Sequence, residues 1–323
     1  MQAFLVSENE TGFSGAWNHV SEPELLDGHV RIQVEYSSLN YKDALSYSGN
    51  KGVTRKFPHV PGIDAAGVVV SSQSDFFSKG DEVLVTGYDL GMNTFGGFAD
   101  LVAVPENWII KRPIGFSALD AMILGTAGLT AGLCVDKLLH NDIKPDQGSI
   151  LVSGASGGVG SIACKLLSKL GFNITAVQRD NTKQGFLESL GVTDFISMDE
   201  LLAGDGKPLL KPAFAAAIDV AGGKTLAAIL KQIKPSGSVA ACGLVDNLAL
   251  DTTVLPFILR GINLLGVDSV EIPLSQKQAV WNKFAEDWKI DAQYQLIERE
   301  QLKDYLEALL KGEAKGRYVL KLK

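Results

Sequence analysis

The feature that most constrains the fold is a regular alternation of apolar strand patterns and helical patterns between residues 149 and 268. The expected strands are Ser149–Ser153, Asn173–Val177, Asp194–Ser197, Ala215–Val220, Ser238–Cys242 and Asn263–Asp268. The expected helices between them are Val159–Leu170, Lys183–Leu190 and Lys224–Gln232. Because parallel strands are joined by crossover connections, this alternation predicts an α/β domain with helices covering a doubly wound parallel sheet.

The rest of the chain follows a different pattern. Gly, Pro, Asp and Ser separate five short strands in the first third, as in a mainly β domain: Met1–Val6, Val30–Tyr36, Ala65–Val70, Glu82–Val85 and Ala99–Val104. Helical patterns follow at Ser117–Gly125, which Ser117 is expected to cap, and at Thr130–Leu139. The tail predicts helices at Ser275–Ile290, with Trp281, Phe284 and Trp288 on one face, and at Gln301–Leu310, then a strand at Gly316–Leu322. We expect the tail to rejoin the first domain, so that residues 1–122 and 269–323 form one domain and residues 123–268 the other.

Composition narrows the class of protein. A length of 323 residues suits two domains, and 46% hydrophobic with 21% charged residues is typical of a globular protein. The formal net charge of −7 argues against a nucleic-acid binder. Cys134, Cys164 and Cys242 form no disulfide framework, so we expect reduced thiols in the cytoplasm. We see no signal peptide at Met1–Glu10 and no run of the roughly 20 apolar residues that a membrane helix needs.

The strongest local signal is a glycine-rich turn between the first strand and the first helix of the α/β domain. It places glycines at Gly154, Gly157 and Gly160, with Ser156, Gly158 and Val159 between them. Such glycines allow a tight turn, a close approach of a pyrophosphate and close helix–strand packing, and the helix N-terminus holds the phosphates. The alternatives are a turn needed only for packing, or the G-x-S-x-G elbow of a hydrolase. The third glycine and the lack of a late histidine argue against the elbow.

The end of the next strand bears on the choice of cofactor. An NAD enzyme places a carboxylate there for the ribose hydroxyls, whereas this chain has Gln178 and Arg179. Arg179 can pair with the 2′-phosphate of NADPH, with Lys183 as a helper. Asp180 offers the opposite interpretation, since it can fill the carboxylate role or neutralise Arg179. We favour NADPH.

A catalytic zinc is poorly supported by the sequence. No cysteine precedes Cys134, and none of the four histidines, His19, His29, His59 and His140, forms a spaced pair. Zinc sites in dehydrogenases need Cys, His and carboxylate ligands at suitable spacing. We therefore expect no metal.

Seven segments together resemble the acrylyl-CoA reductase family, the quinone-oxidoreductase-like branch of the medium-chain dehydrogenases/reductases. They occur in the expected order over nearly the whole chain: Ser37–Ala44, Pro61–Gly67, Gly125–Ala131, Ser153–Ser161, Ala240–Leu244, Pro256–Arg260 and Gly266–Ser269. Asn40 stands where zinc-dependent relatives carry a cysteine ligand, and Pro61–Asp64 stands where they carry Gly-His-Glu.

The resemblance implies a GroES-like mainly β catalytic domain and a Rossmann-type domain with the nicotinamide in the cleft between them. It also implies a homodimer and NADPH-dependent, zinc-independent reduction of acrylyl-CoA to propionyl-CoA. The residues that it places along the cofactor are Tyr41, Ser156–Val159, Gln178–Arg179, Leu244, Ile258 and Ser269. Relatives usually carry Ser-Gly or Thr-Gly in place of Gln178–Arg179, so the geometry of 2′-phosphate binding differs here.

In the expected mechanism, hydride attacks the β-carbon of the enoyl thioester and negative charge builds on the thioester oxygen. Asn40 is a candidate hydrogen-bond donor or a turn residue, and Tyr41 a nicotinamide or substrate contact or a core residue. Asp43 is a candidate catalytic residue or an anchor for its loop. Thr126 and Thr130 bind the carboxamide or cap a helix. By resemblance Arg317 reaches the active site; the alternative is a solvated edge charge.

Two other functions stay open at this point. The first is an NADPH-dependent quinone or enone oxidoreductase. The second is a nucleotide-binding redox sensor without turnover. Lys51, Arg55 and Lys56 suggest a basic rim for the phosphates of coenzyme A, although a solvated loop explains them as well.

Overall fold

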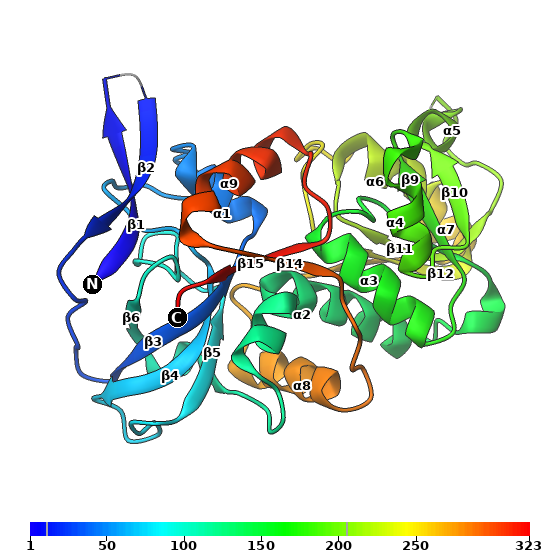
Figure 1. Cartoon of the computed structure of the whole chain (residues 1–323). Coiled ribbons are helices and arrows are strands. Elements are labelled where there is room, and N and C mark those ends of the chain that lie inside the picture. Colours follow the sequence, from blue (N-terminus) through cyan, green and yellow to red (C-terminus); the bar gives the residue numbers. More distant parts are fainter. Residues whose placement is uncertain (11, 205) are drawn as a thin grey trace. The chain divides into compact units, whose positions relative to one another are not determined.

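The structure is a computed structural model that describes residues 1–10, 12–204 and 206–323. The chain divides into two units (Figure 1). Unit 1 comprises Met1–Leu129, Ser269–Lys289 and Gln293–Lys323, and unit 2 comprises Thr130–Asp268 and Ile290–Ala292.

Unit 2 contains a six-stranded sheet in which every pairing is parallel, in the order β10-β9-β8-β11-β12-β13. The strands are β8 (Ile150–Val152), β9 (Ile174–Gln178), β10 (Asp194–Ser197), β11 (Phe214–Asp219), β12 (Ile233–Ala241) and β13 (Asn263–Gly266). From β8 the chain builds outward to β10 on one side and then to β13 on the other. The predicted doubly wound parallel sheet is confirmed, and its strand order reverses between β8 and β11, where such sheets bind ligands.

Helices of unit 2 connect these strands. They are α3 (Gly158–Lys169), α4 (Gln184–Ser189), α5 (Met198–Leu202), α6 (Gly223–Leu230) and α7 (Leu255–Arg260), with 3-10 turns η2 (Pro145–Gln147) and η3 (Asn181–Lys183). Leu151, Ala217, Ile229 and Val239 are fully buried in the core between sheet and helices. Helices α5 and α7 were not predicted, because five or six residues are too few to show a helical period.

Unit 1 is built on an open sheet in the order β14-β15-β3-β4-β5-β7, with β6 also paired to β3. Its strands are β3 (His29–Ser38), β4 (Asp64–Ser72), β5 (Glu82–Thr86), β6 (Leu101–Pro105), β7 (Ile109–Lys111), β14 (Tyr294–Ile297) and β15 (Arg317–Lys321). A separate antiparallel pair joins β1 (Gln2–Asn9) and β2 (Gly12–His19). The predicted mainly β domain is confirmed; β2, β7 and β14 were missed, since β2 and β14 lack a buried face.

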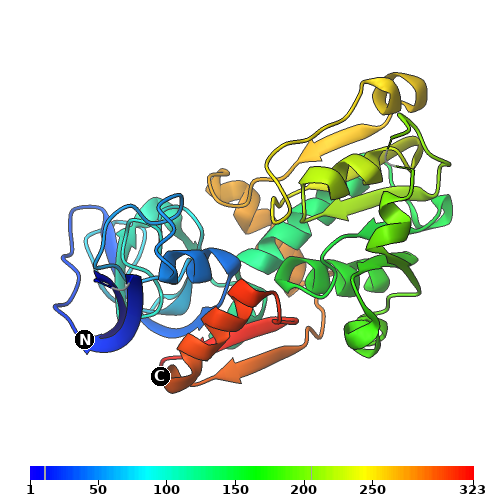
Figure 2. The same ribbon diagram turned by 90° about the horizontal axis from the view of Figure 1, so that it is seen from above.

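The helices of unit 1 are α1 (Tyr41–Tyr47), α8 (Leu274–Ala285) and α9 (Leu302–Lys311), with η1 (Glu106–Trp108) and η4 (Arg299–Gln301). Helix α9 lies beside α1 in both views (Figures 1 and 2), and the Tyr47 hydroxyl donates to Glu307 at 3.3 Å. One expectation is wrong: α8 ends at Ala285, so Trp288 does not share a helical face with Trp281 and Phe284. Trp288 is nevertheless buried, with its ring centroid 5.9 Å from that of Phe284.

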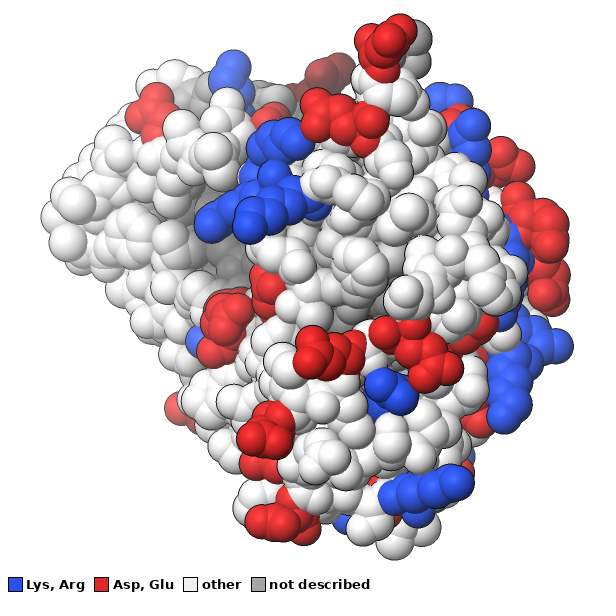
Figure 3. Space-filling model, turned by 90° about the vertical axis from the view of Figure 1, so that its left-hand side faces the viewer, with Lys and Arg blue, Asp and Glu red and all other residues white. Residues whose placement is uncertain are grey.

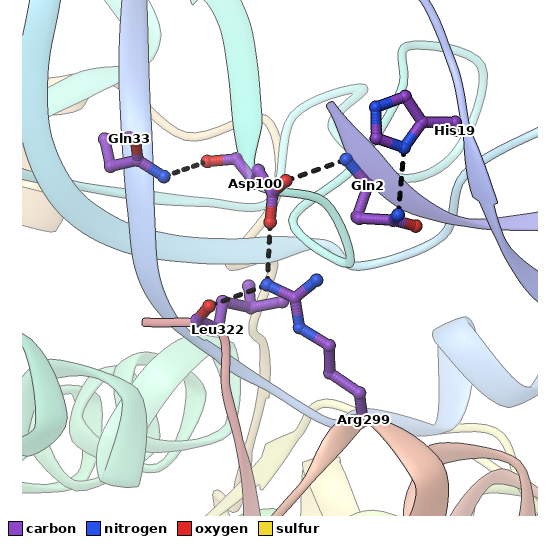
Figure 4. Close-up of polar contacts among 6 residues, drawn as sticks. All are labelled: Gln2, His19, Gln33, Asp100, Arg299 and Leu322. Atoms are coloured by element: carbon purple, nitrogen blue, oxygen red, sulfur yellow. Dashed lines mark hydrogen bonds and ion pairs between the residues drawn. The ribbon is translucent and has the colours of Figure 1, made fainter.

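The C-terminal segment closes onto the N-terminal part of unit 1 through Asp100 (Figure 4). Its carboxylate accepts from the Gln2 backbone at 2.7 Å and from Arg299 at 2.7 Å. The same guanidinium nitrogen of Arg299 donates to the Leu322 carbonyl at 2.7 Å, and the Gln33 amide donates to the Asp100 carbonyl at 2.8 Å. These bonds tie the tail to the N-terminal part of unit 1.

Helix α2 (Ala118–His140) replaces the two helices expected at Ser117–Gly125 and Thr130–Leu139. Ser117 caps it as predicted, because its Oγ accepts from the Asp120 amide at 3.0 Å. At Gly125 the backbone leaves helical geometry, with φ of 54°, so the two arms meet at a kink. By length and composition α2 qualifies as a membrane span, which the sequence analysis did not foresee. However, 78% of its most apolar window is buried, as in a core helix.

Candidate functional site

The glycine-rich turn follows β8 in unit 2 and requires glycine at two positions. Gly154 has φ of 56°, and a Cβ there would lie 2.4 Å from Cγ2 of Val220. A Cβ at Gly160 would lie 2.3 Å from the Gly154 carbonyl oxygen. The turn is closed by a hydrogen bond from the Gly157 amide to the Gly154 carbonyl at 2.9 Å. The sequence therefore folds here into a tight backbone loop that leaves no room for a side chain at Gly154 or Gly160.

The N-terminus of α3 comes directly after this turn. Gly157 is the N-cap and contributes no side-chain cap, so the first-turn amides of Gly158, Val159 and Gly160 have no partner inside the helix. Ser156 is half-buried beside them. Free amides at the positive end of a twelve-residue helix suit a diphosphate group, and the excluded Cβ atoms leave room for its approach. The turn thus fits the diphosphate of a dinucleotide.

A buried aspartate that the sequence analysis missed joins the ends of β8 and β11. The Ser153 hydroxyl donates to Asp219 Oδ1 at 2.6 Å and accepts from the Val220 amide at 3.0 Å, while the Gly222 amide donates to Asp219 Oδ2 at 2.7 Å. Burial raises the pKa of Asp219. The network fixes the edge of the sheet where its strand order reverses. In the sequence, the position of Asp219 at the end of an apolar strand pattern was the feature that could have predicted this role.

The end of β9 carries the residues expected to select the cofactor. Arg179 is exposed, and Lys183 ends the η3 turn. The Asp180 carboxylate accepts from the Thr182 amide at 2.8 Å and from the Thr182 hydroxyl, and these bonds lower the pKa of Asp180. Asp180 is thus engaged in capping η3. Gln178 donates to Asn181 at 3.0 Å, while its buried Oε1 has no partner among the described residues.

The remaining expected cofactor residues are divided between the units. Thr130 is buried in unit 2, and Leu244 and Ile258 of the same unit are 62% and 69% exposed. Thr126 and the buried Ser269 belong to unit 1.

Unit 1 gathers several expected residues around the buried carboxylate of Asp64, at the start of β4. Asp64 Oδ2 accepts from the Ser38 hydroxyl at 2.5 Å, the Asn40 side-chain amide at 2.7 Å and the Thr126 backbone amide at 2.9 Å. Asp64 Oδ1 accepts from the Thr126 hydroxyl at 2.5 Å. We call Asp64 with Ser38, Asn40 and Thr126 the Asp64 cluster. Sequence reasoning proposed Asn40 and Thr126 but gave no role to Asp64 or Ser38.

Asp43 anchors the loop that leads into β4. Its Oδ1 accepts from the amides of Gly62 at 3.1 Å and Ile63 at 2.8 Å, and its Oδ2 accepts from the Asn40 amide at 2.7 Å. Burial, and secondly the nearby Asp64 carboxylate, raise the pKa of Asp43 to about 7. Asp43 therefore holds this loop in place, because three backbone amides donate hydrogen bonds to its carboxylate oxygens.

Arg317 enters the same region from β15. Its side chain donates to the Ile123 carbonyl at 3.0 Å and to the Leu39 carbonyl at 3.2 Å. Arg317 is 3% exposed, so it is not a solvated edge charge, and burial lowers its pKa. Its buried Nη2 has no hydrogen-bond partner among the described residues. Arg317 thus connects two backbone segments, at Leu39 just before Asn40 and at Ile123 just before the kink of α2.

Gly125 and Tyr41 complete this part of unit 1. A Cβ at Gly125 would lie 2.2 Å from Ser38 Oγ and 2.6 Å from Asp64 Oδ2, so only glycine fits the kink. Tyr41 begins α1 and is 43% exposed, which contradicts simple core packing. Its ring is available for contact with a bound molecule.

Charged side chains of the face drawn in Figure 3 are mixed, with Lys and Arg lying among Asp and Glu. Lys51, one of the residues considered for a basic rim, pairs with Glu8 at 3.4 Å and lies 4.7 Å from the ring centroid of Phe57. No group of three His, Cys, Asp or Glu side chains able to hold a metal ion occurs among residues 1–10, 12–204 and 206–323. Cys134, Cys164 and Cys242 are free thiols.

Two family models match the chain. Residues 26–114 match the alcohol dehydrogenase GroES-like domain, and residues 158–286 match the model described as zinc-binding dehydrogenase. The acrylyl-CoA reductase AcuI of Ruegeria pomeroyi is 40% identical over 323 residues, which cover 98% of both proteins.

Two solved structures are similar over the full length. The yhdH oxidoreductase from Salmonella enterica, in complex with NADP, is 40% identical with a TM-score of 0.95, over 100% of both chains. The Bacillus subtilis protein yhfP, with NAD bound, is 39% identical with a TM-score of 0.94, over 99% of both chains.

Proposed function

The chain belongs to the acrylyl-CoA reductase family of the medium-chain dehydrogenases/reductases, and on this premise we propose that it reduces the carbon–carbon double bond of acrylyl-CoA to give propionyl-CoA. The observation that carries this proposal is the full-length relationship to an acrylyl-CoA reductase. The Asp64 cluster supports it, because Asn40 stands where zinc-dependent relatives carry a cysteine ligand and its side-chain amide donates to Asp64. We therefore propose a zinc-independent reaction.

We propose NADPH as the cofactor, which supplies the hydride when bound. The amides of Gly158, Val159 and Gly160 would hold its diphosphate, and Arg179, with Lys183, its 2′-phosphate. The bonds from Thr182 to the Asp180 carboxylate support this choice, since they give that carboxylate a role in the η3 cap. The related yhdH structure holds NADP, whereas the yhfP structure holds NAD, so Arg179 is the residue to test.

We assign a substrate contact in unit 1 to Tyr41, beside Asn40 and Thr126, whose side chains donate to Asp64. Negative charge that builds on the thioester oxygen needs donors in a preorganised site. Tyr41 is exposed and carries a hydroxyl donor. Asp43 and Arg317 hold the backbone that presents these side chains, as their bonds to Ile63 and Leu39 indicate.

We also propose a cytoplasmic homodimer. Strand β13 is the last strand of the unit 2 sheet, and among the residues that the structure describes it pairs with β12 alone. Leu264 on β13 is an exposed apolar side chain of this edge. An apolar sheet edge of this kind favours pairing with a second chain. Free thiols suit a reducing compartment.

The direct test is NADPH oxidation with acrylyl-CoA, crotonyl-CoA and a panel of simple quinones. We expect the highest kcat/KM with acrylyl-CoA. Higher values with quinones would replace this function by a quinone reductase. NADPH binding without turnover on any of them would indicate a sensor. A Gly160→Ala variant should lose NADPH binding because its Cβ would collide with the Gly154 carbonyl, whereas Gly185→Ala, with open space around the added Cβ, should retain it.

A further inference from the structure

Asp219 holds the beginnings of three loops that leave neighbouring strands of the unit 2 sheet. It is the last residue of β11, the strand between β8 and β12, and it is fully buried. Its Oδ1 accepts from the hydroxyl of Ser153, directly after β8, at 2.6 Å, and its Oδ2 accepts from the Gly222 amide of its own loop at 2.7 Å. Its backbone carbonyl accepts from the amide of Cys242, directly after β12, at 2.9 Å. The three loops therefore share one buried anchor.

The loop after β8 is the glycine turn, and Asp219 acts on it through Ser153. The Ser153 hydroxyl donates its hydrogen to Asp219 and accepts from the Val220 amide at 3.0 Å. Val220 is thereby held against the turn, since its Cγ2 leaves no room for a Cβ at Gly154. The Gly154 carbonyl accepts from the amide of Gly157, the N-cap of α3, at 2.9 Å. A chain of contacts thus runs from Asp219 to the helix N-terminus that is proposed to bind the diphosphate.

The loop after β12 packs against the backbone that follows Asp219. The Asp246 amide donates to the Ala221 carbonyl at 2.8 Å. A Cβ at Gly243 would lie 2.1 Å from the Val220 carbonyl oxygen, so the two loops are in close contact. The backbone that follows Asp219 is therefore in contact with both neighbouring loops, and it has little freedom to move while Asp219 holds it.

The carboxylate of Asp219 does not suit a direct contact with the cofactor. A carboxylate directed at a diphosphate would repel it. Three donors of unit 2 engage the Asp219 oxygens, because the Ala221 amide also donates to Oδ1 at 3.3 Å, besides Ser153 and Gly222. Asp219 is fully buried, so it has no exposed surface to offer to a bound molecule. Any role of Asp219 toward the cofactor is therefore indirect.

We propose that Asp219 is a positioning residue for the diphosphate of the cofactor, acting through Ser153 and Val220 to hold the glycine turn in shape. This rests on the proposed function, since it requires that the turn bind NADPH. The 2′-phosphate is assigned to Arg179, directly after β9, so its binding does not depend on Asp219. Loss of Asp219 should therefore weaken the diphosphate contact selectively.

The experiment compares the binding of two fragments of NADPH by isothermal titration calorimetry. One is 2′-phospho-ADP-ribose, which contains the diphosphate, and the other is adenosine 2′-monophosphate, which does not. Asp219→Ala should raise the Kd of 2′-phospho-ADP-ribose about tenfold, because the amides of the turn no longer align with the diphosphate. The Kd of adenosine 2′-monophosphate should change less than about twofold, because distant sites act nearly independently.

Ser153→Ala is a milder variant that keeps the test decisive if Asp219→Ala fails to fold. It removes the hydroxyl that links Asp219 to Val220 and should raise the Kd of 2′-phospho-ADP-ribose about threefold or more. The double variant should bind this fragment as Asp219→Ala does, within about twofold, since both substitutions break the same hydrogen bond. Fully additive effects would contradict a shared action of the two residues on the turn.

Asp194→Ala is the matched control, because it removes an exposed carboxylate from β10, at the edge of the same sheet. Both Kd values should stay at their wild-type levels in this variant. Equal weakening of the two fragments in Asp219→Ala and Ser153→Ala would indicate a purely structural role and overturn the proposal, as would no weakening of either. Failure of the wild type to bind 2′-phospho-ADP-ribose would instead reject the proposed function.

Discussion

Arg179 is the residue at which the choice between two cofactors can be tested. Replacing it with Ala removes the cation proposed to pair with the 2′-phosphate, and charge-assisted pairs of this kind are worth about 1.5–3 kcal/mol. We expect the Kd for NADPH to rise about tenfold or more, with little change for NADH. Lys211→Ala removes an exposed positive charge elsewhere in unit 2 and serves as the control. Equal losses for the two cofactors would reject the role of Arg179.

Asp43 predicts how stability depends on pH. Its pKa is about 7 in the folded protein against an ordinary value of 3.8, so the folded state keeps a proton that the unfolded state releases. This contribution to stability is fully present below pH 3.8 and is lost as pH rises through about 7. In urea unfolding between pH 4 and 8, the free energy of unfolding should therefore fall less steeply in Asp43→Asn than in wild type. Identical slopes would show that Asp43 does not titrate in this range.

Sequence reasoning succeeded at residues whose role depends on their neighbours along the chain. Gly154, Gly157 and Gly160 act within seven residues, and the structure assigns them the expected turn. Asp64 and Asp219 went unrecognised, because their partners come from distant segments: Asp64 binds Ser38, 26 residues away, and Thr126, 62 residues away. Such contacts form only when distant segments of the chain pack together, so no local sequence pattern predicts them.

At the scale of elements, the kink in α2 carries a prediction about stability. Gly125 has φ of 54°, and a Cβ there would collide with Ser38 and Asp64. Gly125→Ala should lower the free energy of unfolding by about 2 kcal/mol or more. Gly185→Ala, in α4 with open space around the added Cβ, should raise it by up to about 1 kcal/mol. Chemical denaturation of both variants checks this, and an unperturbed Gly125→Ala would mean that the kink does not need glycine.

Element prediction failed where an element was short or lacked a buried face. The alternation after residue 149 gave every strand of the unit 2 sheet, because those strands are apolar and bounded by glycine. Strand β14 has three exposed residues of four, and α1 is only seven residues long. Their places depend on partners, β15 for the strand and α9 for the helix, that are remote in sequence. Only tertiary packing defines these elements.

For the whole molecule, the exposed edge of β13 predicts a dimer. Wild type should show twice the 34.5 kDa chain mass by light scattering. Leu264→Arg places a charge on that edge and should shift the protein toward the monomer. Ile114→Arg alters an isolated exposed side chain of unit 1 and should leave the mass unchanged. A wild-type monomer would exclude the dimer. A dimer that persists in Leu264→Arg would show that the two chains associate through another surface.

The protein is proposed to hold the diphosphate of NADPH at the glycine turn and to transfer hydride from its nicotinamide to an enoyl thioester without a metal. The most direct test of this proposal is a single turnover of chelator-treated protein with acrylyl-CoA and NADPH that carries two deuterium atoms at C4 of the nicotinamide. We expect propionyl-CoA with deuterium at the β-carbon by mass spectrometry and NMR. Propionyl-CoA without that label, or turnover that appears only after a metal ion is restored, would contradict the claim.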